Sequence, residues 1–342
     1  MSMNTKKIKV NLISETVFTV QGHGVHTAFL ETRDALKKIG VEVKTNSNEK
    51  CNIVHIHTVG IYSLVKLLKN RRKTIVTAHV VPNSFVGSFA LAKLWLPLAK
   101  IYLRFFYNKA AAIIAVSPEV KEELKELGIK KKIYILANSV NLNKFKKDEK
   151  TSESLRKRMG INKEDFVVLM VGQLQPRKGI EPFIDVAKKL PTIRFIWAGG
   201  IPFKWLAADY HKMKKLQKNA PKNIYFTGTA GFDEMPSYYN ASDMLFFPSF
   251  QETFGFAVIE AGACRIPLLL RDLEIYKPIF NGNFIKGDEK NFKEHIIRLK
   301  EDKNFYKKYS DKAYKLAEKY ENTKMARSLV KIYAEVLEGK NR

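Results

Sequence analysis

The 342-residue sequence contains little cysteine and no long apolar run. Its two cysteines, Cys51 and Cys264, lie far apart, so we expect neither a disulfide framework nor a zinc site, and we interpret both as buried thiols in a reducing compartment. No segment offers the ~20 uninterrupted apolar residues of a membrane-spanning helix, and no apolar run of signal-peptide length stands near residue 1. The length allows about two domains. Hydrophobic residues make up 45% of the chain, which excludes general disorder.

Acidic side chains are also scarce: 34 Asp and Glu face 60 Lys and Arg, a formal net charge of +26. Between Glu49 and Glu119 the sequence has no acidic residue at all. A solvated surface normally mixes both signs, so this stretch predicts a face that meets phosphates. The charge alone is compatible with nucleic acid, an anionic membrane surface or an acidic small molecule as partner.

Residues 85–109, inside the acid-free stretch, combine cations with aromatic side chains. On a helix Lys93, Lys100 and Arg104 recur at steps of seven and four and share one face, while aromatic residues occupy the opposite face. This pattern is typical of a helix lying in a bilayer interface. An ordinary helix that packs its aromatic side on the core fits equally well, and Pro97 puts the continuity of the helix in doubt. The membrane-facing set that we expect is Lys93, Trp95, Lys100 and Arg104, together with Arg71 and Arg72 of a basic loop.

Strand-like and helix-like segments alternate in two series, which predicts an α/β fold with two parallel, doubly wound sheets. Ligands of such sheets bind at the carboxyl ends of the strands. We place the domain boundary in the polar, Lys-rich stretch between the series: residues 1–145 form the first domain, 146–164 a linker, 165–325 the second domain, and 326–342 a C-terminal helix that returns to the first domain. The expected strands are 8–13, 53–57, 74–78, 112–116 and 132–136, then 166–171, 194–198, 223–226, 244–247 and 267–270.

The strongest motif follows the strand that ends at Phe247. A short loop carries Glu252, a helix begins near Gly255, and Glu260 follows within that helix. The free N–H groups and positive dipole end of a helix N-terminus suit a diphosphate, and glycine lets a ligand approach the backbone. At ~1.5 Å per helical residue the two carboxylates are roughly 10–12 Å apart. This separation suits the two ends of a nucleotide-sugar, with one carboxylate on the sugar hydroxyls and the other on the ribose.

A second motif, residues 171–179, carries a buried strand into a glycine-containing turn that presents Arg177 and Lys178. Two cations at the carboxyl end of a strand can neutralise a diphosphate leaving group. Taken alone, a loop with two solvated charges is the simpler interpretation. The diphosphate hypothesis therefore depends on this loop occurring together with the first motif.

Three histidines stand at strand ends: His55 and His57 on one strand, and His79 on the next. A metal site would need a carboxylate nearby, and this region has none. The sequence also contains no Asp-x-Asp. We therefore expect no metal.

Together these segments resemble family four of the retaining, GT-B-type nucleotide-sugar glycosyltransferases. Glu252 and Glu260 match the family's Glu-(seven residues)-Glu signature, and Lys178-Gly179 match the Lys-Gly of its phosphate loop. The resemblance covers most of the chain and implies two Rossmann-like doubly wound domains that face each other across a cleft. It also includes Gly22-His23-Gly24 as the N-terminal glycine loop, Thr77-Ala78-His79 as a strand end, Ala115-Val116-Ser117, and residues 138–145 as the interdomain segment.

The resemblance implies roles for individual residues. Glu252 contacts the donor sugar, Glu260 the ribose, and His79 lies near the reacting carbon. The family's usual Gly-Arg is here Gly172-Gln173, so one phosphate-binding cation is missing and Arg177 would substitute for it. The expected catalytic residues are His79, Glu252 and Lys178; the donor-binding residues are Arg177, Gln173, Glu260, Thr253, Phe254, Gly255 and Gly24; and His57 joins the membrane-facing set on the acceptor side. The UDP-sugar is a substrate, and no cofactor is expected. Mg²⁺ is not required at the site, and stimulation of the reaction by Mg²⁺ stays open.

Residues 172–180, 195–200 and 271–277 resemble more narrowly the diacylglycerol-glycolipid synthases of low-GC Gram-positive bacteria and mollicutes. This implies UDP-glucose or UDP-galactose as donor, monoglucosyl-diacylglycerol as acceptor, and a peripheral protein on the cytoplasmic face of an anionic membrane. The alternatives are first-step transfer to diacylglycerol, a soluble transferase for polysaccharide or protein acceptors, and an inactive scaffold suggested by Gln173. A nucleic-acid-binding protein is not favoured, because no nucleic-acid-binding module is recognised in the sequence.

Overall fold

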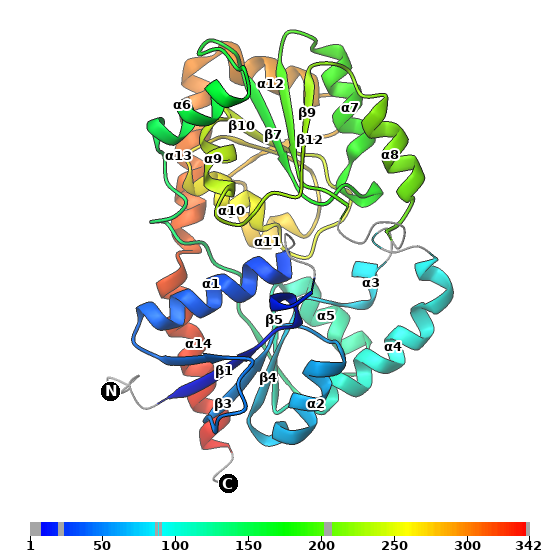
Figure 1. The fold of residues 1–342 in the computed structure, drawn as a ribbon, viewed down its shortest axis with the longest axis vertical. Helices are drawn as coiled ribbons and strands as arrows, with labels where there is room; N and C mark the ends of the chain where they lie inside the picture. Colours follow the sequence, from blue (N-terminus) through cyan, green and yellow to red (C-terminus); the bar gives the residue numbers. More distant parts are fainter. Residues whose placement is uncertain (1–7, 20–23, 86–87, 89–90, 202–206, 340–342) are drawn as a thin grey trace. The chain divides into compact units, whose positions relative to one another are not determined.

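The computed structural model describes residues 8–19, 24–85, 88, 91–201 and 207–339, without the side chain of Lys93 (Figure 1). The chain divides into two compact units. Unit 1 comprises Met1–Val86, Leu91–Asn141 and Tyr320–Arg342. Unit 2 comprises Gly87–Ala90 and Leu142–Lys319.

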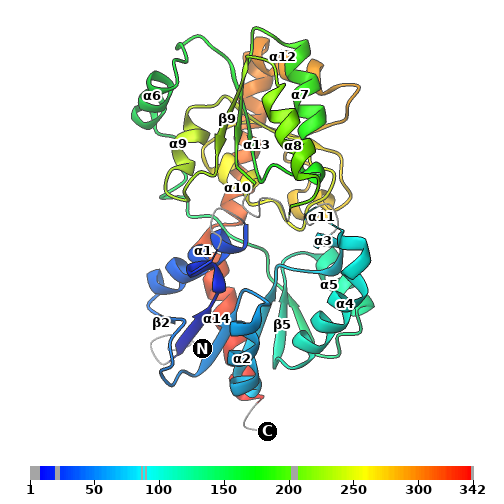
Figure 2. The ribbon, with the colours of Figure 1, turned by 45° about the vertical axis from the view of Figure 1, so that its right-hand side comes forward.

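Unit 1 is a six-stranded parallel sheet in the order β2-β1-β3-β4-β5-β6. The order reverses after β2, so right-handed crossovers place α1 on one face and α2, α4 and α5 on the other (Figure 2). The strands are β1 (Lys9–Ile13), β2 (Glu42–Thr45), β3 (Ile53–Ile56), β4 (Thr74–Ala78), β5 (Ala112–Ala115) and β6 (Lys132–Ile135). The helices are α1 (Gly24–Lys38), α2 (Ile61–Asn70), α3 (Pro82–Phe85), α4 (Ala92–Asn108), α5 (Pro118–Glu126) and α14 (Asn322–Glu338).

Helix α14, from the far end of the chain, belongs to the core of unit 1. Its apolar side chains Ala326, Leu329, Val330 and Tyr333 pack in one cluster with Phe29 and Leu36 of α1 and with β1, β3, β4 and β5. The chain enters α14 beside Val140, whose N–H donates to Tyr320 O and whose carbonyl accepts from Asn322 N. Residues 138–141 and 320–322 thus lie side by side, so the two segments that cross between the units are joined by backbone hydrogen bonds.

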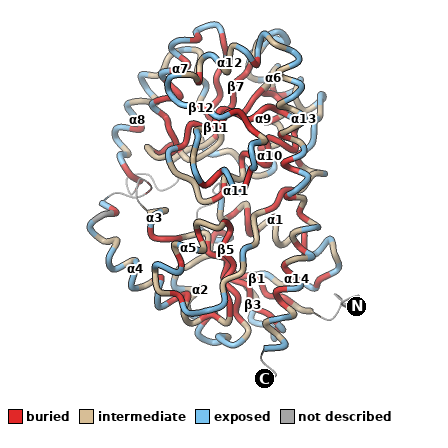
Figure 3. The backbone as a smooth tube through the Cα atoms, turned by 180° about the vertical axis from the view of Figure 1, so that it is seen from behind, coloured by how far each residue is buried: buried red, intermediate tan, exposed pale blue. Residues whose placement is uncertain are grey.

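Unit 2 repeats the architecture with a parallel sheet in the order β12-β11-β10-β7-β8-β9. Its four central strands, β11, β10, β7 and β8, are almost fully buried along their length (Figure 3), as expected for strands covered on both faces, whereas the edge strand β9 has no buried residue. The strands are β7 (Val167–Val171), β8 (Arg194–Ala198), β9 (Ile224–Gly228), β10 (Met244–Phe247), β11 (Leu268–Arg271) and β12 (Ile285–Gly287). The helices are α6 (Glu149–Arg158), α7 (Ile180–Lys189), α8 (Tyr210–Lys218), α9 (Met235–Asn240), α10 (Phe256–Ala263), α11 (Tyr276–Phe280), α12 (Phe292–Glu301) and α13 (Lys303–Lys319).

Some elements differ from the expectation. Residues 146–164 hold α6 and belong to unit 2 rather than to a linker. The Asp148 carboxylate caps this helix by accepting from Thr151 N, and Leu155 is its buried residue, so its polar composition concealed it. Helix α4 runs through Pro97 without interruption, so the hydrogen bond that proline cannot donate does not end the helix. Within the part of the chain described, no helix is both long and apolar enough to cross a bilayer.

Candidate active site

Two loops of unit 2 meet at the carboxyl edge of its sheet, because the strands that carry them, β7 and β10, are neighbours. The Phe250 N–H of one loop donates to the Arg177 carbonyl of the other at 2.8 Å. Gly179 stands between them with φ +76°, and a Cβ there would collide with the Pro248 carbonyl. Only glycine permits both this backbone conformation and this approach, so the Lys-Gly of the phosphate loop sets the spacing of the two loops.

Each loop contributes one charge to a buried ion pair. Lys178 Nζ lies 2.5 Å from Glu252 Oε1, and the two side chains are only 11% and 5% exposed. Lys178 also lies over the ring of Phe247, 5.4 Å from its centre. Burial lowers the pKa of Lys178 to about 8, although the Glu252 charge opposes the shift. The pair places a cation and a carboxylate with low solvation at the carboxyl ends of the strands, the edge at which sheets of this kind usually bind ligands.

Arg177 is held in the same loop by neutral oxygen atoms. Its Nε donates to Ser88 Oγ at 2.7 Å and to Gln175 Oε1 at 3.2 Å, and its Nη1 donates to the Gln251 carbonyl at 3.2 Å. Desolvation lowers the pKa of Arg177, although the nearby Glu252 opposes this. Gln173, which replaces the expected arginine, accepts from Gln175 Nε2 at 2.7 Å. Arg177 therefore brings a second, fixed positive charge to the loop, whereas Gln173 supplies only a neutral amide.

Helix α10 begins beside this pair at Gly255, whose φ of +95° turns the chain from the loop into the helix. Glu260 follows within the helix and is 5% exposed. Its Oε2 accepts a 2.6 Å hydrogen bond from the hydroxyl of Tyr239 in α9. Burial raises the pKa of Glu260 to about 7 although this bond favours the charged form. Glu260 is thus a desolvated acceptor with one oxygen already occupied.

Phe254 differs from its predicted role. The side chain is 1% exposed and packs against Phe256 and Phe280, with ring centres 6.0 and 5.9 Å away. The ring therefore belongs to the core of unit 2, and only the backbone of Phe254 is left for a donor. Thr253, next to it, is half-buried.

Unit 1 brings the three predicted histidines together at the ends of β3 and β4. His57 Nδ1 lies 3.2 Å from His79 Nε2, with the rings stacked 5.3 Å apart. His57 is 2% exposed, so its ring does not lie at a surface where an acceptor could touch it, contrary to the expectation for this residue. Gly24 is the exposed first residue of α1; Gly22 and His23 lie outside the described residues.

Helix α4 carries its apolar surface on an unexpected side. Trp95 is half-buried and meets Phe85 ring to ring at 5.1 Å, and Phe106 is fully buried, so the aromatic side packs inward. The outward side carries large hydrophobic residues that sequence reasoning missed, exposed at 45–76%: Leu94, Leu98, Ile101 and Phe105. Their spacing of four, three and four was the available signal. Lys100, Arg104, Arg71 and Arg72 are exposed as predicted, while the Lys93 side chain is not described.

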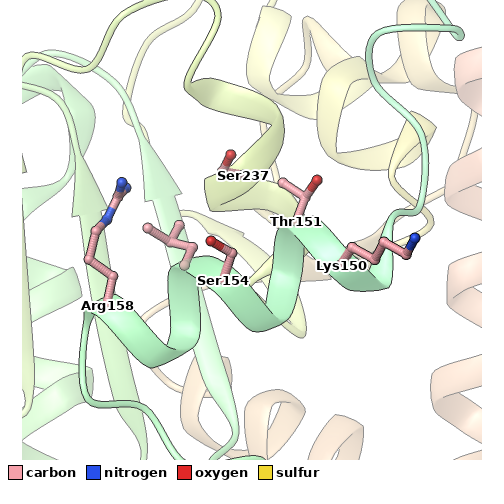
Figure 4. A pocket seen from close by; sticks show the side chains of 6 residues that line it. Lys150, Thr151, Ser154, Arg158 and Ser237 are labelled. Atoms are coloured by element: carbon pink, nitrogen blue, oxygen red, sulfur yellow. The ribbon is translucent and has the colours of Figure 1, made fainter.

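A separate pocket of about 280 Å³ lies between α6 and α9 of unit 2 (Figure 4). Its lining includes Lys150 and Arg158, which are both exposed and therefore solvated. None of the predicted site residues lines it, so it is not the predicted donor site. The remaining lining residues are Thr151, Ser154, Leu155 and Ser237.

Comparison with known proteins gives the same assignment for both units. The family model described as Glycosyltransferase Family 4 matches residues 22–144, and the model described as Glycosyl transferases group 1 matches residues 151–316. The alpha-galactosylglucosyldiacylglycerol synthase of Streptococcus pneumoniae is 31% identical over 93% of this chain and 87% of its own. The chain belongs to glycosyltransferase family 4.

Further relatives agree with this. The processive diacylglycerol alpha-glucosyltransferase of Acholeplasma laidlawii is 28% identical over 97% of this glycosyltransferase and 100% of its own chain. The structure of Anabaena HepE in complex with UDP-glucose matches with a TM-score of 0.75 and 16% identity, covering 96% of this chain and all of that one. The predicted fold class, two Rossmann-like domains of the GT-B type, and the predicted enzyme class are confirmed.

Proposed function

We propose that this glycosyltransferase moves a hexose from a UDP-sugar to a diacylglycerol glycolipid, with monoglucosyl-diacylglycerol as acceptor and a dihexosyl-diacylglycerol as product. The observation that carries the proposal is the buried Lys178–Glu252 pair beside the start of α10. It combines a cation for a leaving diphosphate with an acceptor for sugar hydroxyls. The names of the relatives support the lipid acceptor, since they are glycosyltransferases of diacylglycerol lipids.

In the proposed complex each charged residue of the candidate site contacts one part of the UDP-sugar. Lys178 and Arg177 meet the diphosphate, together with the free N–H groups at Gly255 and the start of α10. Glu260 accepts from the ribose hydroxyls through the oxygen that Tyr239 leaves open. Glu252 accepts from hydroxyls of the hexose. Two protein cations stabilise the departing UDP, so the mechanism that we propose uses no metal ion.

The reaction retains the configuration of the sugar carbon. The bond between that carbon and the diphosphate oxygen breaks, the acceptor hydroxyl attacks from the same face, and its proton leaves with the UDP. Glu252 is not the nucleophile in this scheme, because attack by the acceptor hydroxyl on the face that the UDP leaves needs no covalent intermediate. The rate enhancement comes instead from stabilisation of the departing UDP and from holding the acceptor hydroxyl close to the sugar carbon. His79 of unit 1 supports the positive charge that develops at the sugar.

The acceptor lies in a membrane, and we assign the outward side of α4 to the membrane surface. Leu94, Leu98, Ile101 and Phe105 form an exposed apolar stripe, flanked by Lys100 and Arg104. Such a helix lies in the interface plane, with its apolar residues among the acyl chains and its cations on anionic headgroups. The protein in this proposal is peripheral and works on the cytoplasmic face.

A matrix of two donors and four acceptors tests the function. UDP-glucose and UDP-galactose are each incubated with diacylglycerol, monoglucosyl-diacylglycerol, a soluble polysaccharide and a protein, and UDP release is measured. The proposal expects release with one UDP-hexose and the monoglucosyl lipid. Release with only the soluble acceptors would remove the lipid assignment, and release with diacylglycerol alone would move the enzyme to the first glycosylation.

A further inference from the structure

The carboxyl ends of β3 and β4 in unit 1 hold a row of three histidines that ends at His79. The rings of His55 and His57 are 4.5 Å apart, and those of His57 and His79 are 5.3 Å apart and nearly parallel, at 21°. His57 also meets the edge of Phe29 of α1 at 5.8 Å. The ring of His57 is therefore fixed from both sides and contacts His79 directly.

His55 takes no part in this contact, because both of its ring nitrogens are occupied. Nδ1 lies 2.7 Å from the hydroxyl of Tyr333 in α14, and Nε2 lies 2.6 Å from Thr77 Oγ1 in β4. Burial lowers the pKa of His55 to about 3, so the ring is neutral. Its hydrogen bonds tie α14 to the sheet, which is a structural role.

His57 is different, because only one of its ring nitrogens has a partner in the described part of the chain. Nδ1 lies 3.2 Å from His79 Nε2, while Nε2 is buried and has no hydrogen-bond partner among the residues that the structure describes. Burial lowers the pKa of His57 well below its usual value, so the ring is neutral and carries one proton. The position of that proton determines which of the two rings donates.

Two arrangements satisfy the short contact between the rings. If His79 donates, the proton of His57 sits on the partnerless Nε2 and leaves a buried N–H unsatisfied. If His57 donates from Nδ1, only a lone pair on Nε2 is unsatisfied. Unpaired buried N–H groups are rarer than under-satisfied acceptors, so the second arrangement is favoured. His79 then accepts at Nε2 and carries its own proton on Nδ1.

We propose that His57 is a positioning residue for the glycosyl transfer: it donates from Nδ1 to His79 and fixes both the ring plane and the tautomer of that histidine. The inference rests on the proposed function only in assigning His79 to the reaction. His57 itself is buried beneath His79 and touches neither substrate.

Two amide variants of His57 distinguish a hydrogen bond that positions His79 from a side chain that only fills the space beside it. The amide of His57→Asn occupies the place of the imidazole Nδ1 and can donate to His79, whereas the amide of His57→Gln extends toward the place of Nε2. Both are polar and of similar size, so both leave the burial of the site comparable. We expect His57→Asn to keep kcat within about threefold of wild type and His57→Gln to lose about tenfold to a hundredfold, the scale of a small misplacement of a reacting group. KM for donor and acceptor should stay unchanged in both.

A spectroscopic measurement tests the tautomer without an assay. In ¹⁵N-histidine-labelled protein, two-bond ¹H–¹⁵N correlations show which ring nitrogen of His79 is protonated. We expect Nδ1–H in the wild type and in His57→Asn, and a change to Nε2–H in His57→Gln. Nε2–H on His79 in the wild type would overturn the proposal, and so would equal kcat values for the two variants.

His79→Ala keeps this inference separate from the proposed function. If that variant turns over normally, the role of His79 is wrong, whatever the tautomer experiment shows. If His79→Ala is inactive while His57→Gln keeps normal kcat, only the positioning role of His57 is overturned. Phe29→Leu is the matched control: it removes the edge contact to His57 but no hydrogen bond, and we expect it to change kcat less than threefold.

Discussion

Lys178 and Glu252 form a buried ion pair, with Nζ 2.5 Å from Oε1 and both side chains almost completely out of solvent. They come from loops after adjacent strands, 74 residues apart in the sequence. A pair of charges buried this deeply adds little stability, because desolvation offsets most of the attraction. In the proposed function the pair serves binding: a diphosphate and a sugar would meet a cation and a carboxylate that are already desolvated and held in place.

Lys178→Ala should lower kcat/KM by at least about 100-fold, the scale of removing one preorganised charge at a leaving group. It should also lower the melting temperature, since Glu252 is left buried and unpaired. The double variant Lys178→Ala/Glu252→Gln should recover the melting temperature but not the activity. Lys188→Ala, an exposed lysine of α7, serves as control and should change neither. Near-normal turnover in Lys178→Ala would contradict the assignment of the phosphate loop.

The pH dependence of kcat/KM, which reports the free enzyme, should be bell-shaped with a maximum between about 7 and 8. On the acid side, Glu260 becomes protonated below its pKa of about 7 and no longer accepts from both ribose hydroxyls. On the alkaline side, Lys178 loses its charge above its pKa of about 8 and stops neutralising the diphosphate. Initial rates from pH 5.5 to 9.5 test this. Glu260→Gln should lose the acid limb and keep the alkaline one.

Glu260 should also make the protein less stable as the pH rises. Its pKa is raised by folding from 4.5 to about 7, so the folded state holds the extra proton between these values, and stability falls as the pH increases through that window. Glu260→Gln removes this cost, and at pH 8 we expect its free energy of unfolding to exceed the wild type by about 1–3 kcal/mol. At pH 4 the difference should vanish. Urea titrations at both pH values check the sign; a variant less stable than wild type at pH 8 would show that the carboxylate is better solvated than the structure indicates.

The two kinds of residue on the outward side of α4 should contribute differently to membrane binding. Leu98→Ser/Ile101→Ser should weaken cosedimentation with anionic vesicles at both low and high salt, because it removes apolar insertion. Lys100→Gln/Arg104→Gln should weaken it at low salt and flatten its salt dependence, because ions screen only the charges. Ile135→Ser is the control, since Ile135 is 48% exposed at the end of β6 rather than on α4. Equal binding by all variants would rule out this surface of α4.

The fold could be predicted because buried parallel strands are continuous apolar runs. β4, β8 and β10 begin and end where the sequence indicates, since turn residues bound them. β2 and α6 were missed for the opposite reason. β2 is an edge strand with no buried residue, and α6 has only Leu155 facing inward, so neither shows an apolar pattern.

The site was predictable where its chemistry lies within one loop and not where it depends on contacts between distant segments. Glu252, Glu260 and Lys178 stand in recognisable strand–loop–helix settings. The hydrogen bond from Tyr239 to Glu260 joins residues 21 positions apart, and the one from Arg177 to Ser88 joins residues 89 positions apart. No local sequence pattern encodes either bond. The burial of Phe254 and His57 likewise follows from packing partners that spacing alone does not reveal.

Transfer of a hexose to a membrane lipid can be followed with a label in the sugar itself. UDP-hexose labelled in the hexose is incubated with wild-type protein and anionic vesicles that contain monoglucosyl-diacylglycerol, and label is counted in the organic phase. We predict a labelled dihexosyl lipid, formed by the wild type and reduced at least about 100-fold in Lys178→Ala. Label that stays entirely in the aqueous phase with both UDP-glucose and UDP-galactose would contradict it.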